Sequence, residues 1–267
     1  MSDFTDWGEQ QICQLITGQT IPWPASLSIG LLETVDDANF TEVSWPGYAR
    51  VDAPRSLTTW SGTQGAGSVT TSNGTSRNIT NNVDFDFGTA GTTTSATAIG
   101  VFSNSDLLCY AIRDSALAIN EGDPVIVPAG DVIFSLPGTG GFTNYAVNKL
   151  ADLIFRGQAF SFPSQYRVAL YVKVPDLMGA GGVEASGAGY ARAALSQWSA
   201  PDAGIIRNSQ VVQFGAPTAT WGTISGAGLL DGSGNIFFVQ SYATPKTIAA
   251  GAGAPRFPVD AVAIQVQ

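Results

Sequence analysis

The sequence contains no histidine, and charged side chains are scarce among its 267 residues. Histidine is the usual general base, the usual partner of a Ser or Cys nucleophile and the commonest metal ligand. Its absence argues against the most frequent hydrolytic and metal-dependent mechanisms. Asp, Glu, Lys and Arg make up 12% of the residues, about half of the usual share. Uncharged polar residues and glycine replace them, which favours an all-β protein with many turns over a helical bundle.

Cysteine and long apolar runs are also scarce. The two cysteines, Cys13 and Cys109, are far apart and lack metal-ligand spacing, so we expect buried thiols rather than a disulfide. No apolar run reaches the roughly 20 residues of a membrane span. Residues 1–6 lack the basic start and the apolar stretch of a signal peptide. We therefore expect the protein to fold in a cytosol.

The net charge of −9 is divided unevenly along the chain. An acidic surface is repelled by phosphate backbones and anionic lipids, so neither nucleic acid nor a membrane is an expected partner. Residues 1–139 carry a net charge of −11, whereas residues 140–267 carry +2. Two interpretations stay open: drift on solvated surfaces, or two halves that face different neighbours.

The two halves of the chain repeat one another. The clearest match aligns Glu42–Arg50 with Glu184–Arg192, and both segments end in the tetrapeptide Gly-Tyr-Ala-Arg. Other matches keep the same order, including Gly122–Ile126 with Gly253–Phe257, so a duplication is indicated. The signature residues of the repeat are Gly47, Tyr48, Arg50 and Trp60 in the first half and Gly189, Tyr190, Arg192 and Trp198 in the second.

The recurring side chains are expected to set the structure of each module. We expect Arg50 and Arg192 to lie over an aromatic ring or to bond loop carbonyls. Trp60 and Trp198 recur at one place in both halves, which favours packing over ligand contact. Trp45 has no aromatic counterpart in the second half, so we expect it to be an exposed contact.

Each half begins with a helical pattern and continues in short strands. Apolar spacing near 3.6 residues ends at Gly18 in the first half and at Gly157 in the second, as in an amphipathic helix followed by glycine. Alternation with a period of two follows, most clearly in Val83–Phe87. The sequence predicts an all-β protein of two tandem β-sandwich-like modules, each preceded by a short amphipathic α-helix.

A turn-rich link at residues 137–141 separates the two modules. We place the first module at residues 1–139 and the second at residues 140–267. The first module carries a polar, glycine-rich insertion at residues 61–82, which we expect to be a mobile surface loop.

No set of residues indicates catalysis, a cofactor or a metal site. Asp84 and Asp86 lie on one face of a strand and could hold a hard cation, but solvated strand acids explain them more simply. A carbohydrate hydrolase would need two carboxylates at a defined separation, and no pair is singled out. The sequence therefore predicts a protein that is not an enzyme.

The second half contains three motifs: the Gly-rich loop Glu184–Arg192, Thr220–Thr223 (Thr-Trp-Gly-Thr) and Thr244–Thr247 (Thr-Pro-Lys-Thr). Through these motifs, residues 144–267 resemble a small β-module of tailed bacteriophages and prophages, usually described as a tail-fibre-like or uncharacterised virion protein. The first half is a looser copy that lacks the last two elements. The resemblance implies a virion location, assembly in the host cytoplasm and other virion proteins as partners; it brings no catalytic residues.

Three functions stay open after this resemblance. The first is a non-enzymatic structural protein of the virion: a tail, fibre or collar component, or a capsid decoration (cement) protein, acting through protein–protein contacts. The second is a module of the phage tail that binds a host glycan or receptor. The third is an enzyme such as a polysaccharide depolymerase. Low charge, β-modules and duplication favour the first.

The duplication also bears on assembly. Three chains of two modules present six modules, and virions contain both three-fold and six-fold positions. We therefore expect a homo-oligomer, with a trimer favoured. The charge difference between the halves favours contacts between the first module of one chain and the second module of the next.

Overall fold

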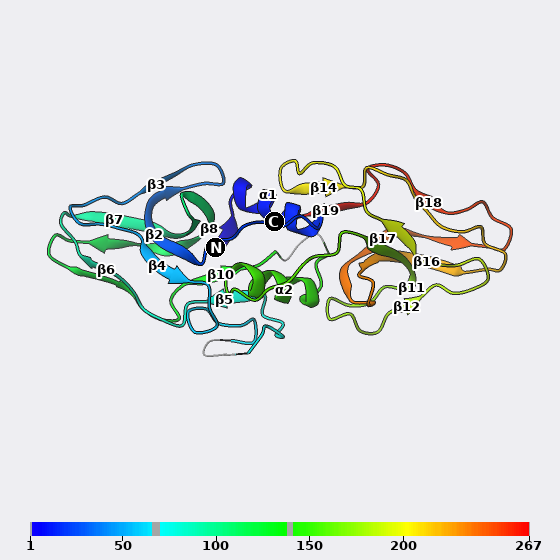
Figure 1. The fold of residues 1–267 in the computed structure, drawn as a ribbon, viewed down its shortest axis with the longest axis horizontal. Helices are drawn as coiled ribbons and strands as arrows, with labels where there is room; N and C mark the ends of the chain where they lie inside the picture. The colour runs from blue at the N-terminus through cyan, green and yellow to red at the C-terminus, as the bar shows by residue number, and fades with distance from the viewer. Residues whose placement is uncertain (1, 66–69, 138–140, 267) are drawn as a thin grey trace. The chain divides into compact units, whose positions relative to one another are not determined.

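The computed structural model describes residues 2–65, 70–137 and 141–266. Strands dominate this part of the chain, and a short helix stands near the start of each half (Figure 1). The duplicated all-β architecture predicted from the sequence is confirmed. The elements of the first half are β1 (Ser2–Phe4), α1 (Asp6–Ile16), β2 (Ser26–Val35), β3 (Phe40–Glu42), β4 (Val51–Pro54), β5 (Asn78–Thr80), β6 (Phe85–Thr89), β7 (Thr94–Ser103), β8 (Asp106–Ile119), β9 (Pro124–Val127) and β10 (Ile133–Ser135).

The second half has the same order of elements from its helix onward, and Phe142, just before that helix, bridges Phe238 as Phe4 of β1 pairs with Cys109. Its elements are α2 (Asn144–Ile154), β11 (Tyr166–Lys173), β12 (Val183–Glu184), β13 (Ala193–Leu195), β14 (Ile205–Arg207), β15 (Val212–Gln213), β16 (Gly222–Leu230), β17 (Ile236–Ile248), β18 (Arg256–Phe257) and β19 (Ala263–Gln265).

Both helices begin at a threonine that also bonds a strand. The hydroxyl of Thr5 accepts the backbone N–H of Gly8 at 3.1 Å and donates to the carbonyl of Leu107 at 2.5 Å. Thr143 makes the equivalent pair of bonds at the start of α2. An N-cap side chain satisfies one of the N–H groups that have no partner inside the helix. The second bond of each threonine fixes the start of the helix to the sheet of its own half.

The first module is built on an antiparallel sheet of six strands, in which β8, β7 and β2 lie side by side (Figure 1). β2 pairs with β7 along one edge, and with β4 and then β3 along the other. The two-stranded sheets β5–β10 and β6–β9 contact the large sheet through β10 and β6 and supply the second layer.

The second module repeats this arrangement, with β11, β16 and β17 in the places of β2, β7 and β8. A β-bulge is repeated as well. Thr97 occupies it in β7 and donates to the carbonyl of Glu33 at 2.7 Å. Ser225 occupies it in β16 and donates to the carbonyl of Val172 at 2.8 Å. The strand registers therefore align the two modules residue by residue.

These registers correct one detail of the sequence alignment. Phe85 lies opposite Val127 in the first module, and Val212 lies opposite Phe257 in the second. Phe257 is therefore equivalent to Val127. The sequence match had paired Phe257 with Ile126, which is wrong by one residue. The two alignments differ by one residue because the sequence match superposes the glycine and proline of the turn. The strand register instead superposes residues that have equivalent partners on the neighbouring strand.

The compact units of the fold differ from the two sequence halves. Unit 1 comprises residues 1–11, 21–136 and 148–160, and unit 2 comprises the rest of the chain. Each unit thus contains the final part of a helix that begins in the other. The division into independent domains at residues 139 and 140 stays a proposal.

In each unit, a side chain donates a hydrogen bond to the last carbonyl of the helix whose end lies in that unit. In unit 1, the guanidinium Nε of Arg55 donates to the carbonyl of Ile154, the last residue of α2, at 2.8 Å. In unit 2, the hydroxyl of Tyr166 donates to the carbonyl of Ile16, the last residue of α1, at 2.9 Å. The last carbonyls of a helix have no partner inside it. In both units a side chain from the other sequence repeat supplies that partner.

The ends of the insertion have counterparts in the second module. The N–H of Ser61 donates to the carbonyl of Thr80 at 2.8 Å, and the N–H of Ser199 donates to that of Arg207 at 2.7 Å. The additional residues of the first module therefore lie inside residues 62–77, a shorter range than the sequence indicated.

Part of the insertion is anchored inside unit 1. Ser72 donates its N–H to the carboxylate of Asp152 at 2.9 Å. Arg156 is 1% exposed and binds Ser72 Oγ at 3.1 Å and Asp152 at 3.0 Å. A buried charge requires such a partner. The expectation of a mobile surface loop is wrong for this anchored part, and residues 66–69 lie outside the described residues.

Candidate functional site

Tyr48 and Tyr190 fill the same gap in the two sheets. β4 pairs with β2 up to Ile29 and β3 pairs with it from Leu32, which leaves the N–H of Leu31 between two short strands. The hydroxyl of Tyr48 accepts this N–H at 2.9 Å. The hydroxyl of Tyr190 accepts the N–H of Leu170, in β11, at 3.0 Å. Each phenol takes the place of a missing strand partner for one backbone group.

In the first module, Glu42 joins the tyrosine to the arginine of the signature. The hydroxyl of Tyr48 donates to Glu42 Oε1 at 2.7 Å. Arg50 bonds the same carboxylate through Nε and Nη2, both at 3.0 Å from Oε2. The guanidinium also lies 3.4 Å from the ring centroid of Phe102 and donates to the carbonyl of Asn104 at 3.1 Å. Arg50 thus makes both kinds of contact expected from the sequence, together with an ion pair that the sequence analysis did not anticipate.

Glu184 forms the same cluster in the second module. Tyr190 donates to Glu184 Oε1 at 2.8 Å, and Arg192 binds both oxygens of Glu184 at 2.9 and 2.7 Å. Partial burial acts to raise the pKa of Glu184, but the hydrogen bonds from Arg192 and Tyr190 outweigh it, so the pKa lies below its usual range. Burial raises the pKa of Tyr190 well above its usual range. The phenol is therefore a neutral donor, and this Glu–Tyr–Arg cluster is suited to holding loops.

Glycine precedes each signature tyrosine for a steric reason. Gly47 has φ +90° and Gly189 has φ +87°, a region that other residues rarely adopt. A Cβ at Gly189 would lie 2.1 Å from the carbonyl oxygen of Ala216, whereas a Cβ at Gly47 would meet nothing within 4 Å. Both turns require a positive φ, and the turn at Gly189 also has no room for a Cβ.

The signature tyrosines lie between two aromatic side chains. Tyr48 stands edge-on to Trp45 at 4.7 Å between centroids and stacks on Phe87 at 6.1 Å. Tyr190 stands edge-on to Trp221 at 5.2 Å and stacks on Phe214 at 6.4 Å.

The prediction that Trp45 is an exposed contact is wrong. The side chain is 5% exposed, because it packs on Tyr48. Trp45 also has a counterpart in space, Trp221, which comes from a different position in the repeat and likewise stands edge-on to the signature tyrosine of its module. A linear alignment could not reveal this equivalence.

Trp60 packs as expected, whereas Trp198 is only half-buried and stands edge-on to Tyr166 at 6.0 Å between ring centroids. The backbone of each tryptophan forms a bridge with a buried asparagine. Trp60 is fully buried and lies 5.2 Å from the ring centroid of Phe155. Its backbone pairs with Asn81, and that of Trp198 pairs with Asn208. The sequence analysis did not single out either asparagine.

The two asparagines hold the last strands of their modules. Asn81 accepts the N–H of Val132 at 3.0 Å, and Asn208 accepts that of Val262 at 2.7 Å. Both asparagines are 0% exposed. Of the residues that recur in both modules, those at the Glu–Tyr–Arg clusters and at these asparagines are therefore engaged in holding the fold.

Asp84, just before β6, and Asp86, in β6, both accept hydrogen bonds from backbone N–H groups. Asp84 accepts the N–H of Ala129 and Asp86 accepts that of Gly88, both at 2.8 Å. Within the described residues, no group of three or more Cys, Asp or Glu side chains is placed to hold a metal ion. Neither described helix is long and apolar enough to cross a bilayer. Cys13 and Cys109 are both buried thiols.

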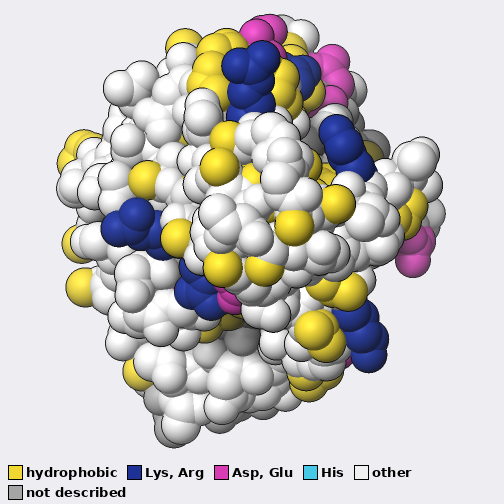
Figure 2. All heavy atoms as spheres, turned by 90° about the vertical axis from the view of Figure 1, so that its right-hand side faces the viewer, with side chains coloured by type: hydrophobic (Ala, Val, Ile, Leu, Met, Phe, Trp, Pro, Cys, Tyr) yellow, Lys and Arg dark blue, Asp and Glu magenta, His cyan; other side chains and the backbone are white. Residues whose placement is uncertain are grey.

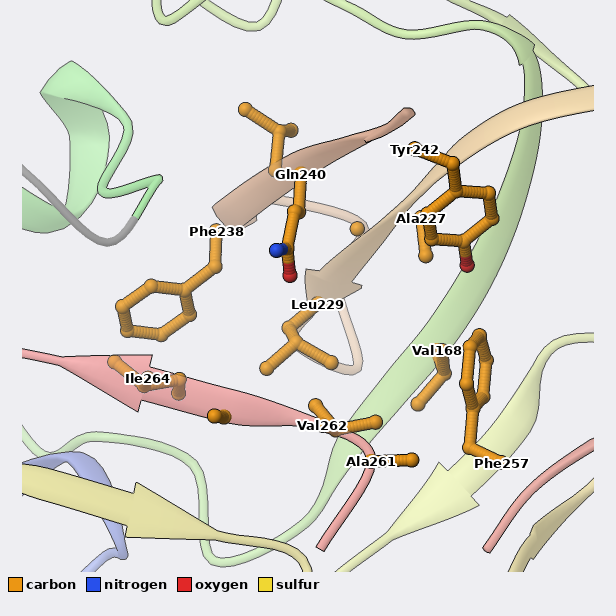
Figure 3. A pocket seen from close by; sticks show the side chains of 13 residues that line it. Val168, Ala227, Leu229, Phe238, Gln240, Tyr242, Phe257, Ala261, Val262 and Ile264 are labelled. Carbon is orange, nitrogen blue, oxygen red and sulfur yellow. The ribbon is translucent and has the colours of Figure 1, made fainter. Parts of the chain in front are cut away.

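The second module contains a cavity of about 470 Å³ beside β17 and the loop that leads into β18. Its charged lining residues are Lys246 and Arg256. Tyr242 belongs to its wall and also to that of a smaller apolar cavity of about 50 Å³, which Figure 3 shows. On the face of this module in Figure 2, Lys and Arg side chains are scattered among hydrophobic ones rather than gathered in one patch.

The family to which the chain is similar matches both halves of the chain. A family model described as podophage GP4 fiber I protein gp80 matches the chain twice, over residues 3–135 and 141–265. No curated protein matches the chain. The two matched segments correspond to the two modules. The chain belongs to the family of the podophage GP4 fiber I protein gp80 and is a phage virion component with two copies of that module.

Proposed function

We propose that the chain is a non-enzymatic structural component of a phage fibre that acts through protein–protein contacts. The observation that carries the proposal is the use of the recurring polar side chains. The Glu–Tyr–Arg clusters of both modules bond one another and the adjoining backbone. Residues preserved between the two copies therefore support the architecture, as a building block requires.

The proposed assembly is a homo-oligomer, with a trimer favoured. Three chains would present six modules to a site of three-fold or six-fold symmetry. The net charge is −11 for residues 1–139 and +2 for residues 140–267. Contacts between unlike modules of neighbouring chains would lower the repulsion between like charges and guide association.

Native mass spectrometry of the purified protein, together with cryo-EM of intact particles, tests this proposal. We expect a trimer whose association weakens with salt, because exposed charge pairs are screened beyond about 8–10 Å at physiological ionic strength. A chain that stays monomeric in solution and touches no second copy on the particle would contradict the proposal. The cryo-EM map would also separate a fibre position from a capsid decoration or collar position.

A second candidate function is the binding of a host-surface glycan. The cavity with Lys246 and Arg256 favours it, whereas Trp45 does not support it because that side chain is buried. Binding of the labelled protein to polysaccharide isolated from the host surface tests this candidate. Equal binding of the protein to a polysaccharide from a non-host source would exclude specific recognition.

A further inference from the structure

The cavity beside β17 has the dimensions and wall of a small-ligand site. Its volume of about 470 Å³ lies inside the range of roughly 300–1,000 Å³ that ligand pockets usually show. One wall is aromatic: the ring centroid of Phe257 lies 6.1 Å from that of Phe214 and 6.4 Å from that of Tyr242. Tyr242 and Phe257 are half-buried.

The cavity is electropositive. Lys246 and Arg256 are both exposed, and within residues 2–65, 70–137 and 141–266 neither forms an ion pair. Asp and Glu do not occur among the described residues that line the cavity. Two cations without a local counter-charge favour an anionic group, and Lys and Arg form short, charge-assisted hydrogen bonds with carboxylate and phosphate oxygens.

The first module provides an internal comparison. Lys246 lies opposite Ile224 in the strand register, and Leu117 lies opposite the equivalent Ala96. Leu117 therefore stands where the second module has Lys246. By the same reasoning Ile126 stands where the second module has Arg256, because these residues pair with Asp86 and Gln213. The module folds with apolar residues at both places, so the two cations are not required by the architecture.

We propose that this cavity of the second module binds an anionic sugar, that is, a sugar ring with a carboxylate or phosphate substituent. Lys246 and Arg256 hold the anionic group. Phe257 packs against the apolar face of the ring. The inference deepens the second candidate function by naming its site and ligand class, and it is independent of the proposed oligomer.

Ligand-observed NMR titration of the full-length protein tests the ligand class. The probes are D-glucuronate, D-glucose 6-phosphate, D-glucose, acetate, inorganic phosphate and a Glu-rich peptide. We expect one or both anionic sugars to bind at least tenfold more tightly than glucose, acetate and phosphate, and the sugar that binds identifies the substituent. Equal binding of the simple anions, tighter binding of the peptide, or no binding of either anionic sugar would overturn the proposal.

Substitution tests the site. The variant Lys246→Gln/Arg256→Gln should lose at least tenfold in affinity for the anionic sugar. Lys173→Gln/Arg167→Gln removes two exposed cations of the same module that lie outside the cavity, and it should bind as the unchanged protein does. If the sugar binds and the first variant retains full affinity, the cavity is the wrong site although glycan binding stands. Melting temperature and native mass check that each variant folds and assembles.

Discussion

The hydroxyl of Tyr166, in the first strand of the second module, donates to the carbonyl of Ile16, the last residue of helix α1. Both residues belong to unit 2, although Ile16 comes from the first sequence repeat. Tyr166 and Ile16 are each 0% exposed. Water therefore cannot replace the bond, and this single contact bears on the stability of the unit.

The variant Tyr166→Phe should lower the free energy of unfolding by about 1–3 kcal/mol, because it leaves a buried carbonyl without a partner. Denaturant unfolding followed by circular dichroism measures the change. Tyr171→Phe is the control, since the hydroxyl of Tyr171 makes no side-chain hydrogen bond within the described residues, and it should be close to neutral. An equal loss in both variants would contradict this role of Tyr166.

The two signature glycines should respond differently to alanine. Gly47→Ala should cost about 1–2 kcal/mol, because a left-handed conformation disfavours any Cβ although the space around it is open. Gly189→Ala should cost clearly more or prevent folding, since its Cβ would lie 2.1 Å from the carbonyl oxygen of Ala216. Melting temperatures of the two variants check the order. Equal costs would mean that the turn of Gly189 relaxes.

Acid should weaken the second module through Glu184. Its pKa in the folded protein lies below the usual value, so the stability it contributes is present above about pH 4.3 and is lost as the pH falls through the folded pKa. Glu184→Gln should therefore be less stable at neutral pH, and the difference from the unchanged protein should shrink as the pH falls through the folded pKa. Melting curves across this range provide the measurement. A difference that is constant with pH would contradict the assignment.

Fragments test whether the sequence halves are independent domains. A fragment of residues 1–139 lacks residues 148–160 of unit 1, including Phe155 and the carbonyl of Ile154 that Arg55 bonds. A fragment of residues 1–160 contains them. We expect the longer fragment to unfold cooperatively at a higher temperature, because truncating a large buried aromatic contact costs about 3–5 kcal/mol. Equal stability of the two fragments would support the division at residues 139 and 140.

The sequence was sufficient for those features that rest on local order. Helix ends at Gly18 and Gly157 follow from periodicity and from glycine after the last turn, and both glycines have positive φ. The duplication follows from the identical tetrapeptide around Tyr48 and Tyr190. These features depend on neighbours in the chain, and a single sequence displays them.

Features that depend on non-local packing could not be predicted. Trp45 and Trp221 occupy equivalent places beside their tyrosines but come from different positions in the repeat, so alignment made Trp45 look unmatched. Asn81 and Asn208 resemble ordinary turn residues until their bonds to the last strands are known. The anchoring of Ser72 by Arg156 joins residues far apart in the sequence, and composition alone suggested a free loop.

The sharing of helix ends between the compact units has a consequence for the history of the gene. A deletion that removes residues 140–267 also removes residues 148–160 from unit 1, and a deletion of residues 1–139 removes residues 12–20 from unit 2. We therefore expect loss of either copy to destabilise the copy that remains. Selection would then maintain both repeats even where only one of them binds a partner, and the surface of each would be free to diverge. A duplication with shared helix ends would in this way be hard for evolution to reverse.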